Sequence, residues 1–253
     1  MAQQRLSRRQ VLTLLGAGAT TVLAACSKGA STALSASSTT TSPSTTPPSS
    51  TSTTSATSTT TAQAAASTAA PSCVLTPEMT EGPYYLAGEP NRSDVTEGRP
   101  GTPLKLVLPV VNASTCKPIA GATVEIWHAD AGGNYSGFGS ATSNKSFLRG
   151  AQTTDRNGEA TFVTIYPGWY QGRATHIHVK VHVGGNVVHT GQLFFDDASN
   201  SAVYAKVPYT GRSGQRTLNA QDGIYSNGGA QSMVQLTPDG DGYTGRLTMG
   251  VRS

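Results

Sequence analysis

Residues 176–195 read HIHVKVHVGGNVVHTGQLFF, and they carry the clearest strand pattern of the chain. From His176 to Val183 polar and apolar residues alternate, as they do on a strand with one buried face. Gly184-Gly185-Asn186 then supplies the small residues of a tight turn, and Val187–Phe195 is again rich in strand-forming residues. The sequence therefore predicts two antiparallel strands joined by a short turn.

Short runs of the same kind recur from Cys73 onward, and Gly, Asn, Asp and Pro separate them. No long stretch keeps the period of an amphipathic helix. The spacing of the runs and the turn residues between them suit two packed sheets. We therefore predict an all-β fold, a β-sandwich of mainly antiparallel strands over residues 73–253. The further strands expected are Leu104–Val111, Thr123–Trp127, Ala160–Ile165 and Tyr243–Val251.

Residues 1–26 have the composition of an export signal peptide, with a basic start, an apolar middle and a small-residue end. Arg8-Arg9 is typical of the twin-arginine route. Leu23-Ala24-Ala25-Cys26 has the pattern of a lipoprotein cleavage site, after which the cysteine carries lipid. We therefore expect an exported protein, anchored through Cys26 on the outer face of the bacterial cytoplasmic membrane, or secreted. The alternative is an ordinary signal peptide with a chance cysteine.

Residues 27–72 consist mostly of Ser, Thr, Ala and Pro, and such a segment is expected to be a disordered linker. Four basic residues precede Glu78, the first acidic residue, and they equal the net charge of +4. The remainder of the chain is balanced. This balance argues against a nucleic-acid partner, because nucleic-acid-binding domains carry a basic excess.

Two cysteines remain for the folded part once Cys26 is assigned to the lipid anchor. An exported domain works where disulfides persist. Cys73 and Cys116 are therefore predicted to form one disulfide that ties the start of the domain to its body. Two free, buried thiols are the alternative, and neither cysteine is expected to be catalytic.

The predicted strand from His176 projects His176 and His178 from the same face, side by side, as a single metal ion requires. Lys180 and His182 continue this face, and the residues between them point to the core. One alternative is a polar, solvent-facing strand that contains histidine by chance. Another is a Zn or Cu enzyme that uses the two histidines without tyrosine.

Two tyrosines accompany the histidines: Tyr135 follows the predicted strand Thr123–Trp127, and Tyr170 precedes His176 by a few residues. A phenol has a pKa near 10 and is a poor ligand for weakly acidic metals. A hard, strongly Lewis-acidic ion such as Fe(III) can remove its proton. Two phenolates and two imidazoles would leave Fe(III) with a single positive charge, suited to a dianionic catecholate. Taken alone, each tyrosine would more often be a half-buried aromatic residue of a sandwich.

Six motifs follow one another along residues 76–195, and together they resemble the intradiol ring-cleavage dioxygenase family. Their order is that of the family, which makes the match far more specific than the His-x-His pair alone. The chain looks like the shorter, exported members, which lack the helical dimerisation region of cytoplasmic catechol dioxygenases. The motifs are TEGPYY (80–85), PIAGATVEIWHADAGGNYS (118–136), LRG (148–150), TTDRNG (153–158), TIYPGWY (164–170) and HIH (176–178).

The resemblance implies that Tyr135, Tyr170, His176 and His178 bind a non-haem Fe(III) ion. Tyr135 and His176 would be equatorial ligands, and Tyr170 and His178 axial ones. The implied activity is cleavage of catechol-type aromatic 1,2-diols between the two hydroxyls by O2, which gives cis,cis-muconate-type diacids. The released Tyr170 would take a proton from the diol as a general base.

Two more residues fall where the family has groups near the iron. Arg173 would stabilise negative charge that develops on the substrate ring, and its alternative is a surface salt bridge. Gln192 would lie near the ligands, and its alternative is a strand-surface amide, since Gly191 departs from the threonine that is usual there. Structural roles are expected for Asp130 and Arg149, as a hydrogen-bonding scaffold near Tyr135, and for His128, His182 and His189.

The sequence thus predicts an exported Fe(III) dioxygenase whose partners are a small aromatic diol and O2. A non-catalytic module that is tethered to the envelope and binds ferric iron or catecholates would use the same four ligands. Oxygen consumption with ring opening separates the two. The diol stays open among catechol, protocatechuate, hydroxyquinol and larger lignin-derived diols, and so does the oligomeric state.

Overall fold

The computed structural model describes residues 73–253. The predicted signal peptide (1–26), its Cys26 and the predicted linker (27–72) lie outside the described residues, so these stay predictions. Within residues 73–253, none of the helices has the length and apolar character needed to cross a membrane.

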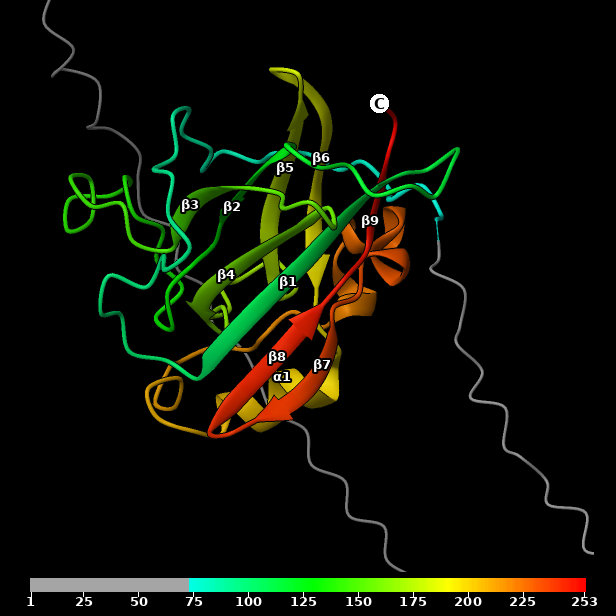
Figure 1. Ribbon diagram of the computed structural model, residues 1–253. Helices are drawn as coiled ribbons and strands as arrows, with labels where there is room; N and C mark the ends of the chain where they lie inside the picture. Colours follow the sequence, from blue (N-terminus) through cyan, green and yellow to red (C-terminus); the bar gives the residue numbers. More distant parts are fainter. Residues whose placement is uncertain (1–72) are drawn as a thin grey trace, which may run out of the picture. The chain divides into compact units, whose positions relative to one another are not determined.

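Nine strands and one short α-helix make up the described domain, which confirms the all-β prediction (Figure 1). Single turns of 3₁₀ helix lie at Asn219–Gln221, Tyr225–Asn227 and Gly229–Gln231. The elements are, in chain order, β1 (Pro103–Asn112), β2 (Thr123–Trp127), β3 (Arg149–Thr153), β4 (Glu159–Ile165), β5 (His176–Val183), β6 (Asn186–Phe194), α1 (Asp197–Tyr204), β7 (Gln235–Asp239), β8 (Gly242–Arg246) and β9 (Met249–Val251).

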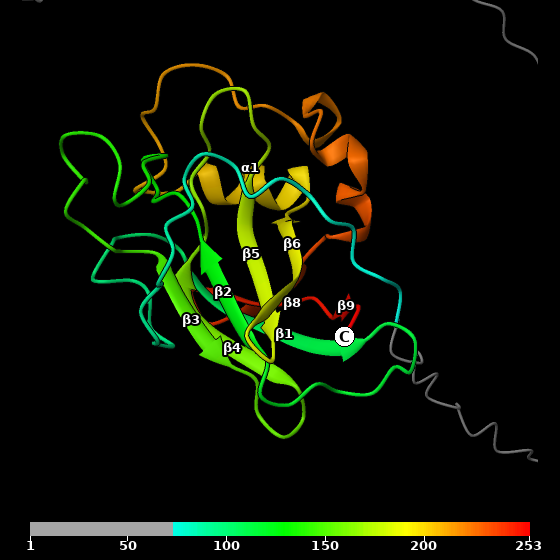
Figure 2. The same cartoon turned by 90° about the horizontal axis from the view of Figure 1, so that it is seen from above.

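Two sheets form the sandwich (Figures 1 and 2). One has the strand order β3-β2-β5-β6 and is antiparallel throughout. The other has the order β4-β1-β8-β7, with β9 also on β1, and β1 pairs in parallel with β8 and β9. The core joins the two sheets, because Leu106 and Leu108 of β1 and Ile126, Ile177 and Val179 of the other sheet are fully buried in one cluster.

The hairpin of β5 and β6 turns at Gly184 and Gly185, whose φ angles are 57° and 82°. A two-residue turn of this type needs left-handed backbone at both positions, which glycine adopts without steric cost. Asn186 already pairs with Val183, so β6 begins one residue earlier than predicted. A register shift between Val181 and His182 then brings Gln192 directly opposite His178.

The single strand predicted for Tyr243–Val251 is instead two strands, β8 and β9, which follow β1 in one continuous register. The gap between them lies opposite Pro109. Val110 donates its N–H to the Gly158 carbonyl on the β4 side, so position 109 faces β8 and β9. Proline has no N–H to donate, and the ladder of hydrogen bonds is therefore interrupted at this point.

The sequence patterns do not predict β3, β7 or α1. β3 (RGAQT) and β7 (QLTPD) have no apolar alternation, and pairing with β2 and β8 holds them in place. The helix α1 has eight residues, too few for a repeating apolar period. Its start is capped by Asp196, whose carboxylate accepts the Ser199 N–H.

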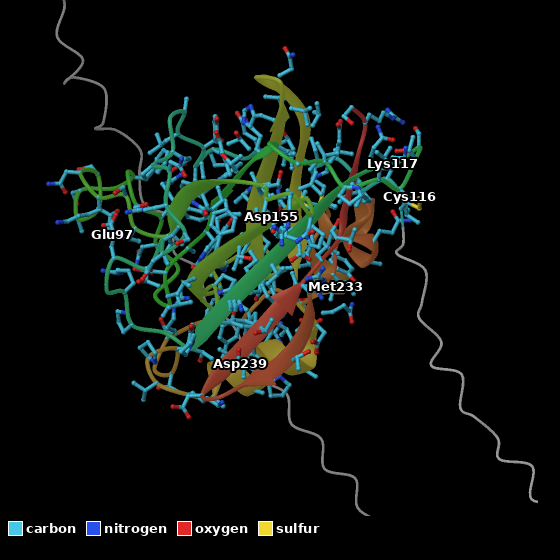
Figure 3. The ribbon with its side chains drawn as sticks, viewed as in Figure 1. Glu97, Cys116, Lys117, Asp155, Met233 and Asp239 are labelled. Carbon is cyan, nitrogen blue, oxygen red and sulfur yellow. A yellow bond between two sulfur atoms is a disulfide. The ribbon has the colours of Figure 1, made fainter. Side chains whose placement is uncertain are left out.

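The two cysteines of the described chain lie close together. The Cα atoms of Cys73 and Cys116 are 5.1 Å apart, at disulfide distance. Cys116 lies beside Lys117 in the turn that follows β1 (Figure 3). The start of the domain is thus next to its body, as predicted.

After α1 the chain forms a long irregular segment, residues 205–234, which includes the 3₁₀ turns. Phe194, at the end of β6, donates its N–H to the Ser232 carbonyl, and the Val234 N–H donates to the Phe194 carbonyl, each at 2.8 Å. Figure 2 shows the segment, in orange, beside α1 and the ends of β5 and β6. Because Phe194 pairs with His176, the segment lies beside the predicted site.

Candidate functional site

Strand β5 places two imidazoles side by side on the face opposite the core. His176 and His178 are both buried, and their Nε2 atoms are 3.1 Å apart. Ile177 and Val179, between and after them, belong to the fully buried core cluster. The alternation that predicted β5 therefore also predicts the direction of both rings.

Two loops bring phenol oxygens to the same point. Tyr135, after β2, has its hydroxyl 3.5 Å from the Nε2 atom of His176, and the hydroxyl of Tyr170, between β4 and β5, is 3.2 Å from the same atom. Tyr135 is buried and Tyr170 is half-buried. The structure thus brings the four predicted ligands together from three separate segments.

The spacing of these atoms fits one metal ion. Two ligand atoms that are each about 2.0–2.1 Å from an ion and about 90–110° apart lie about 2.9–3.4 Å from each other. His176 donates its Nδ1–H to the Ala174 carbonyl at 2.7 Å, which leaves a lone pair on Nε2. Among the described residues no three His, Cys, Asp or Glu side chains form a metal-binding group, so the two phenols are the further protein donors that this site offers.

Burial determines the charge of the four side chains. It lowers the pKa of His176 to about 3 and holds the pKa of His178 well below its usual value, so both rings are neutral near pH 7. It raises the pKa values of Tyr135 and Tyr170, so neither phenol loses its proton without a strong cation beside it. Neutral imidazoles and phenols that need a strong Lewis acid suit a hard, highly charged ion such as Fe(III).

Arg173 and Gln192 lie next to the four donors and contact each other. The Arg173 guanidinium donates to the side-chain oxygen of Gln192, and Gln192 donates to the Thr80 carbonyl at 2.9 Å. Arg173 also pairs with Asp222, whose side chain is 2% exposed. The ion pair that was the alternative for Arg173 is therefore present, but it lies beside the site with a buried partner.

Aromatic rings form the walls of the site. Trp127 stacks on His178 with ring centres 4.9 Å apart and an angle of 3° between the ring planes. Tyr84, from the entry segment 80–85, stacks on Tyr135 at 4.2 Å and meets Tyr170 edge-on. A cavity of about 510 Å³ opens beside Tyr84 and Tyr135, and its other lining residues include Arg99, Asn134, Phe138 and Ala141.

The loop that carries Tyr135 is held by buried charges. Arg149 donates to the carbonyl and hydroxyl oxygens of Ser136 and pairs with Glu89 at 3.2 Å. Asp130 accepts the Asn134 N–H at 2.9 Å. The contacts of Asp130 and Arg149 are those of the predicted scaffold near Tyr135.

The remaining histidines of the described chain are not among the four converging donors. His128 contacts the Thr164 hydroxyl and the Ala129 carbonyl. His182 faces Glu125 at 3.3 Å, and His189 is buried. Each has the kind of structural environment that the sequence predicts.

Sequence reasoning missed Asp222, which comes from the irregular segment after α1. Burial opposes its charge, but hydrogen bonds from the Ala174 and Ile224 N–H groups and the Arg173 guanidinium hold the pKa of Asp222 below its usual value. The sequence around it, Asn219-Ala-Gln-Asp222-Gly, matches no motif. Its contacts with Arg173 and Ala174 span more than forty residues, so no local pattern signals them.

Comparisons with known proteins agree with this geometry. The model of a protein family described as "Dioxygenase" matches residues 80–208. Catechol 1,2-dioxygenase from Acinetobacter baylyi is 31% identical over 163 residues, which are 55% of this chain and 51% of that protein. Catechol 1,2-dioxygenase 1 from Acinetobacter lwoffii is 37% identical over 101 residues and 32% of its length. The chain thus spans about half or less of the length of these two relatives.

A solved structure extends the likeness over the whole described domain. The intradiol ring-cleavage dioxygenase from Tetranychus urticae is 38% identical, has a TM-score of 0.68, and is matched over 71% of this chain and 95% of its own. The dioxygenase domain of a dioxygenase carbohydrate-binding protein fusion from Streptomyces sp. SirexAA-E is 31% identical, with a TM-score of 0.55 over 70% of this chain and 98% of its own.

Proposed function

Because this chain belongs to the intradiol ring-cleavage dioxygenase family, we propose that it is a non-haem Fe(III) enzyme that cleaves catechol-type 1,2-diols between their hydroxyls. The observation that carries the proposal is the convergence of Tyr135, Tyr170 and His178 on His176, with atom separations of 3.1–3.5 Å. The relatives named catechol 1,2-dioxygenase support the same reaction class.

The four side chains would hold the ion, since two neutral imidazoles and two phenolates partly balance its charge and leave positions for other ligands. Fe(III), when bound, supplies Lewis acidity that lowers the proton affinity of the phenols and of a chelating diol. Tyr170 is the more exposed of the two phenols, so it is the better placed to leave and to accept a proton from the diol.

Arg173 supplies a fixed positive charge beside the donors, because Asp222 and Gln192 hold its guanidinium from two sides. A charge that needs no reorganisation stabilises the negative charge that develops on the diol ring as it reacts. The carbon–carbon bond between the two hydroxyl-bearing carbons breaks. Both atoms of O2 enter the diacid, so the balance needs no external reductant.

The test is dioxygen uptake by the iron-loaded protein on addition of catechol, with ultraviolet spectra of the product. We expect one O2 consumed for each muconate-type diacid formed. Substituted and larger diols belong in the panel, because the cavity of about 510 Å³ beside Tyr84 and Tyr135 has room for more than one ring. Iron-loaded, coloured protein that consumes no O2 with any diol would instead support a module that only binds ferric iron or catecholates.

The proposed site of action is the cell envelope, outside the cytoplasm. The signal-like residues 1–26 support export, and Cys73 and Cys116 at disulfide distance suit an oxidising compartment. Cys26→Ser should move the protein from the membrane fraction to the soluble fraction if Cys26 carries lipid. An unchanged distribution would exclude the lipid anchor.

A further inference from the structure

The carboxylate of Asp222 accepts hydrogen bonds on both of its oxygens. One oxygen takes the Arg173 Nε–H at 3.0 Å and the Ala174 N–H at 2.8 Å. The other takes the N–H of Ile224 at 2.7 Å and that of Tyr225 at 3.4 Å. Asp222 thus fastens the irregular segment after α1 to Arg173 and Ala174, which lie three and two residues before the predicted ligand His176.

Two routes lead from this carboxylate to the candidate metal centre. The first runs through Arg173, whose other end donates to Gln192 opposite His178. The second runs through Ala174, whose N–H binds Asp222 while its carbonyl accepts the Nδ1–H of His176 at 2.7 Å. The same carboxylate therefore orients the guanidinium and anchors Ala174, the residue whose carbonyl sets the tautomer of a ligand.

We infer that Asp222 is a positioning residue of the site, which aims the Arg173 guanidinium at the substrate and holds the Ala174 carbonyl against His176. The inference rests on the proposed function. The segment after α1 is then part of the active-site machinery rather than a cover over the sheet. If the charge of Asp222 is removed, the four donors should remain present but should be poorly oriented.

Asp222→Asn is a sharp test because the two side chains have the same shape. Both oxygens of Asp222 face N–H donors, so an amide must point its NH₂ group at N–H donors in either orientation. A matched control is Asp197→Asn. Asp197 also pairs with an arginine, Arg216, and accepts a backbone N–H, that of Asn219, in the same segment, but it touches no residue of the site.

The measurements are kcat, KM, iron content and the visible absorption of the iron-loaded protein. We expect Asp222→Asn to lower kcat per bound iron by about 10–100-fold, the range typical of residues that orient metal ligands, with little change in KM. Asp197→Asn should keep kcat within about twofold, even if both variants lose stability. Equal kcat per iron in the two variants would overturn the inference.

A double-mutant cycle with Arg173→Gln shows whether Asp222 affects kcat through Arg173 or through a general loss of structural order in the variant. If Asp222 acts through Arg173, the loss of kcat caused by Asp222→Asn should largely disappear when Arg173 is already Gln. Fully additive effects would contradict that route.

Should Asp222→Asn fail to fold, Arg173→Lys replaces it, since one ammonium cannot bridge Asp222 and Gln192 as a guanidinium does. Wild-type kcat in Arg173→Lys would then overturn the inference.

Measuring iron affinity tests the positioning role of Asp222 separately from the proposed ring cleavage. If the wild-type protein cleaves no diol, the Ala174 route still predicts about 10–100-fold weaker iron binding in Asp222→Asn than in Asp197→Asn. Equal iron affinity in the two variants would then reject the positioning role, whatever the reaction is.

Discussion

The backbone carbonyl of Ala174 fixes the tautomer of His176. Because Nδ1–H donates to the Ala174 carbonyl, the Nε2 atom carries a lone pair and faces the Nε2 atom of His178 at 3.1 Å. A neutral His178 can donate a hydrogen bond from this Nε2 atom in one tautomer, and in the other tautomer both Nε2 atoms offer a lone pair to a metal ion. Burial lowers the pKa of His176 to about 3, so its Nε2 lone pair stays free of a proton of its own near pH 7. The carbonyl of Ala174 thus keeps His176 ready to bind a metal ion through Nε2.

Replacing Tyr135 by Phe tests whether phenols are ligands. We expect Tyr135→Phe to lose most of the visible absorption of the iron-loaded protein and at least about 100-fold of kcat/KM, because a charged ligand worth several kcal/mol is removed. Tyr243→Phe is the control, since Tyr243 is a half-buried tyrosine of β8 that packs against the core. Full metal content in Tyr135→Phe, together with a wild-type protein that shows no tyrosinate–iron absorption, would favour a metal site built on the histidines alone.

His189 makes the folded protein sensitive to acid. Burial lowers the pKa of His189 to about 4. Between about pH 6.5, where a free histidine titrates, and pH 4, the unfolded chain binds a proton that the folded chain does not. Folding stability should therefore fall as the pH falls through this window, by up to about 1.4 kcal/mol per pH unit for this residue.

His189→Gln cannot titrate and should make the stability of the protein less dependent on pH between 7 and 4.5. Urea unfolding of both proteins at several pH values measures the difference in slope. His128, whose pKa burial also lowers to about 4, still titrates in the variant, so part of the slope remains. Parallel stability curves for the two proteins would show that His189 is not the group responsible.

Single residues of the site were predictable where the chemistry is local. His176 and His178 share a strand face, and the order of motifs around Tyr135 and Tyr170 identified the two phenols. Asp222 was not predictable, because its partners are distant in sequence and its neighbours follow no period. A carboxylate that binds backbone N–H groups across an irregular segment produces no recognisable pattern in the sequence.

At the level of elements, alternation predicted the strands that have one face in the core. β2 and β5 have the predicted bounds. β3 and β7 lack that alternation, and hydrogen bonds to a neighbouring strand are what make them strands. The gap between β8 and β9 follows from Pro109 on a different strand, so the sequence of Tyr243–Val251 itself does not predict it.

The turn between β5 and β6 is an element whose backbone conformation requires glycine. Gly184→Ala forces a residue with a Cβ into left-handed backbone, with no neighbour to clash, so the cost is one of conformation alone. We expect a loss of about 1 kcal/mol in the free energy of unfolding. Gly223→Ala, at an open position without positive φ, should change it by less than about 0.5 kcal/mol. Equal urea midpoints would contradict the need for glycine.

At the scale of the whole molecule, a bond between Cys73 and Cys116 would close a loop of 43 residues. Cys116→Ser should lower the free energy of unfolding by about 2–4 kcal/mol, and a reducing agent should destabilise the wild-type protein to the same degree. Peptide mapping without reductant checks that the bond forms. Wild-type protein that carries two free thiols and keeps full stability would reject it.

The way the domain closes around the site was the part least open to prediction. Residues 76–95 and 205–234 carry no regular elements that pattern reasoning could place, apart from short turns. Side-chain bonds to backbone groups hold them, such as Gln192 to the Thr80 carbonyl and Asp222 to the Ala174 N–H. The sandwich follows from the sequence pattern, whereas the enclosure of the four donors follows from these individual bonds.

We propose that the four converging donors hold an iron ion that supports ring cleavage by O2. Turnover of catechol under ¹⁸O₂ by the iron-loaded protein, with mass spectrometry of the product, distinguishes this reaction from iron binding alone. We expect a ring-opened diacid that carries two labelled oxygen atoms, and no such product from Tyr135→Phe. Unlabelled product, or catechol recovered intact from protein that holds its iron, would contradict it.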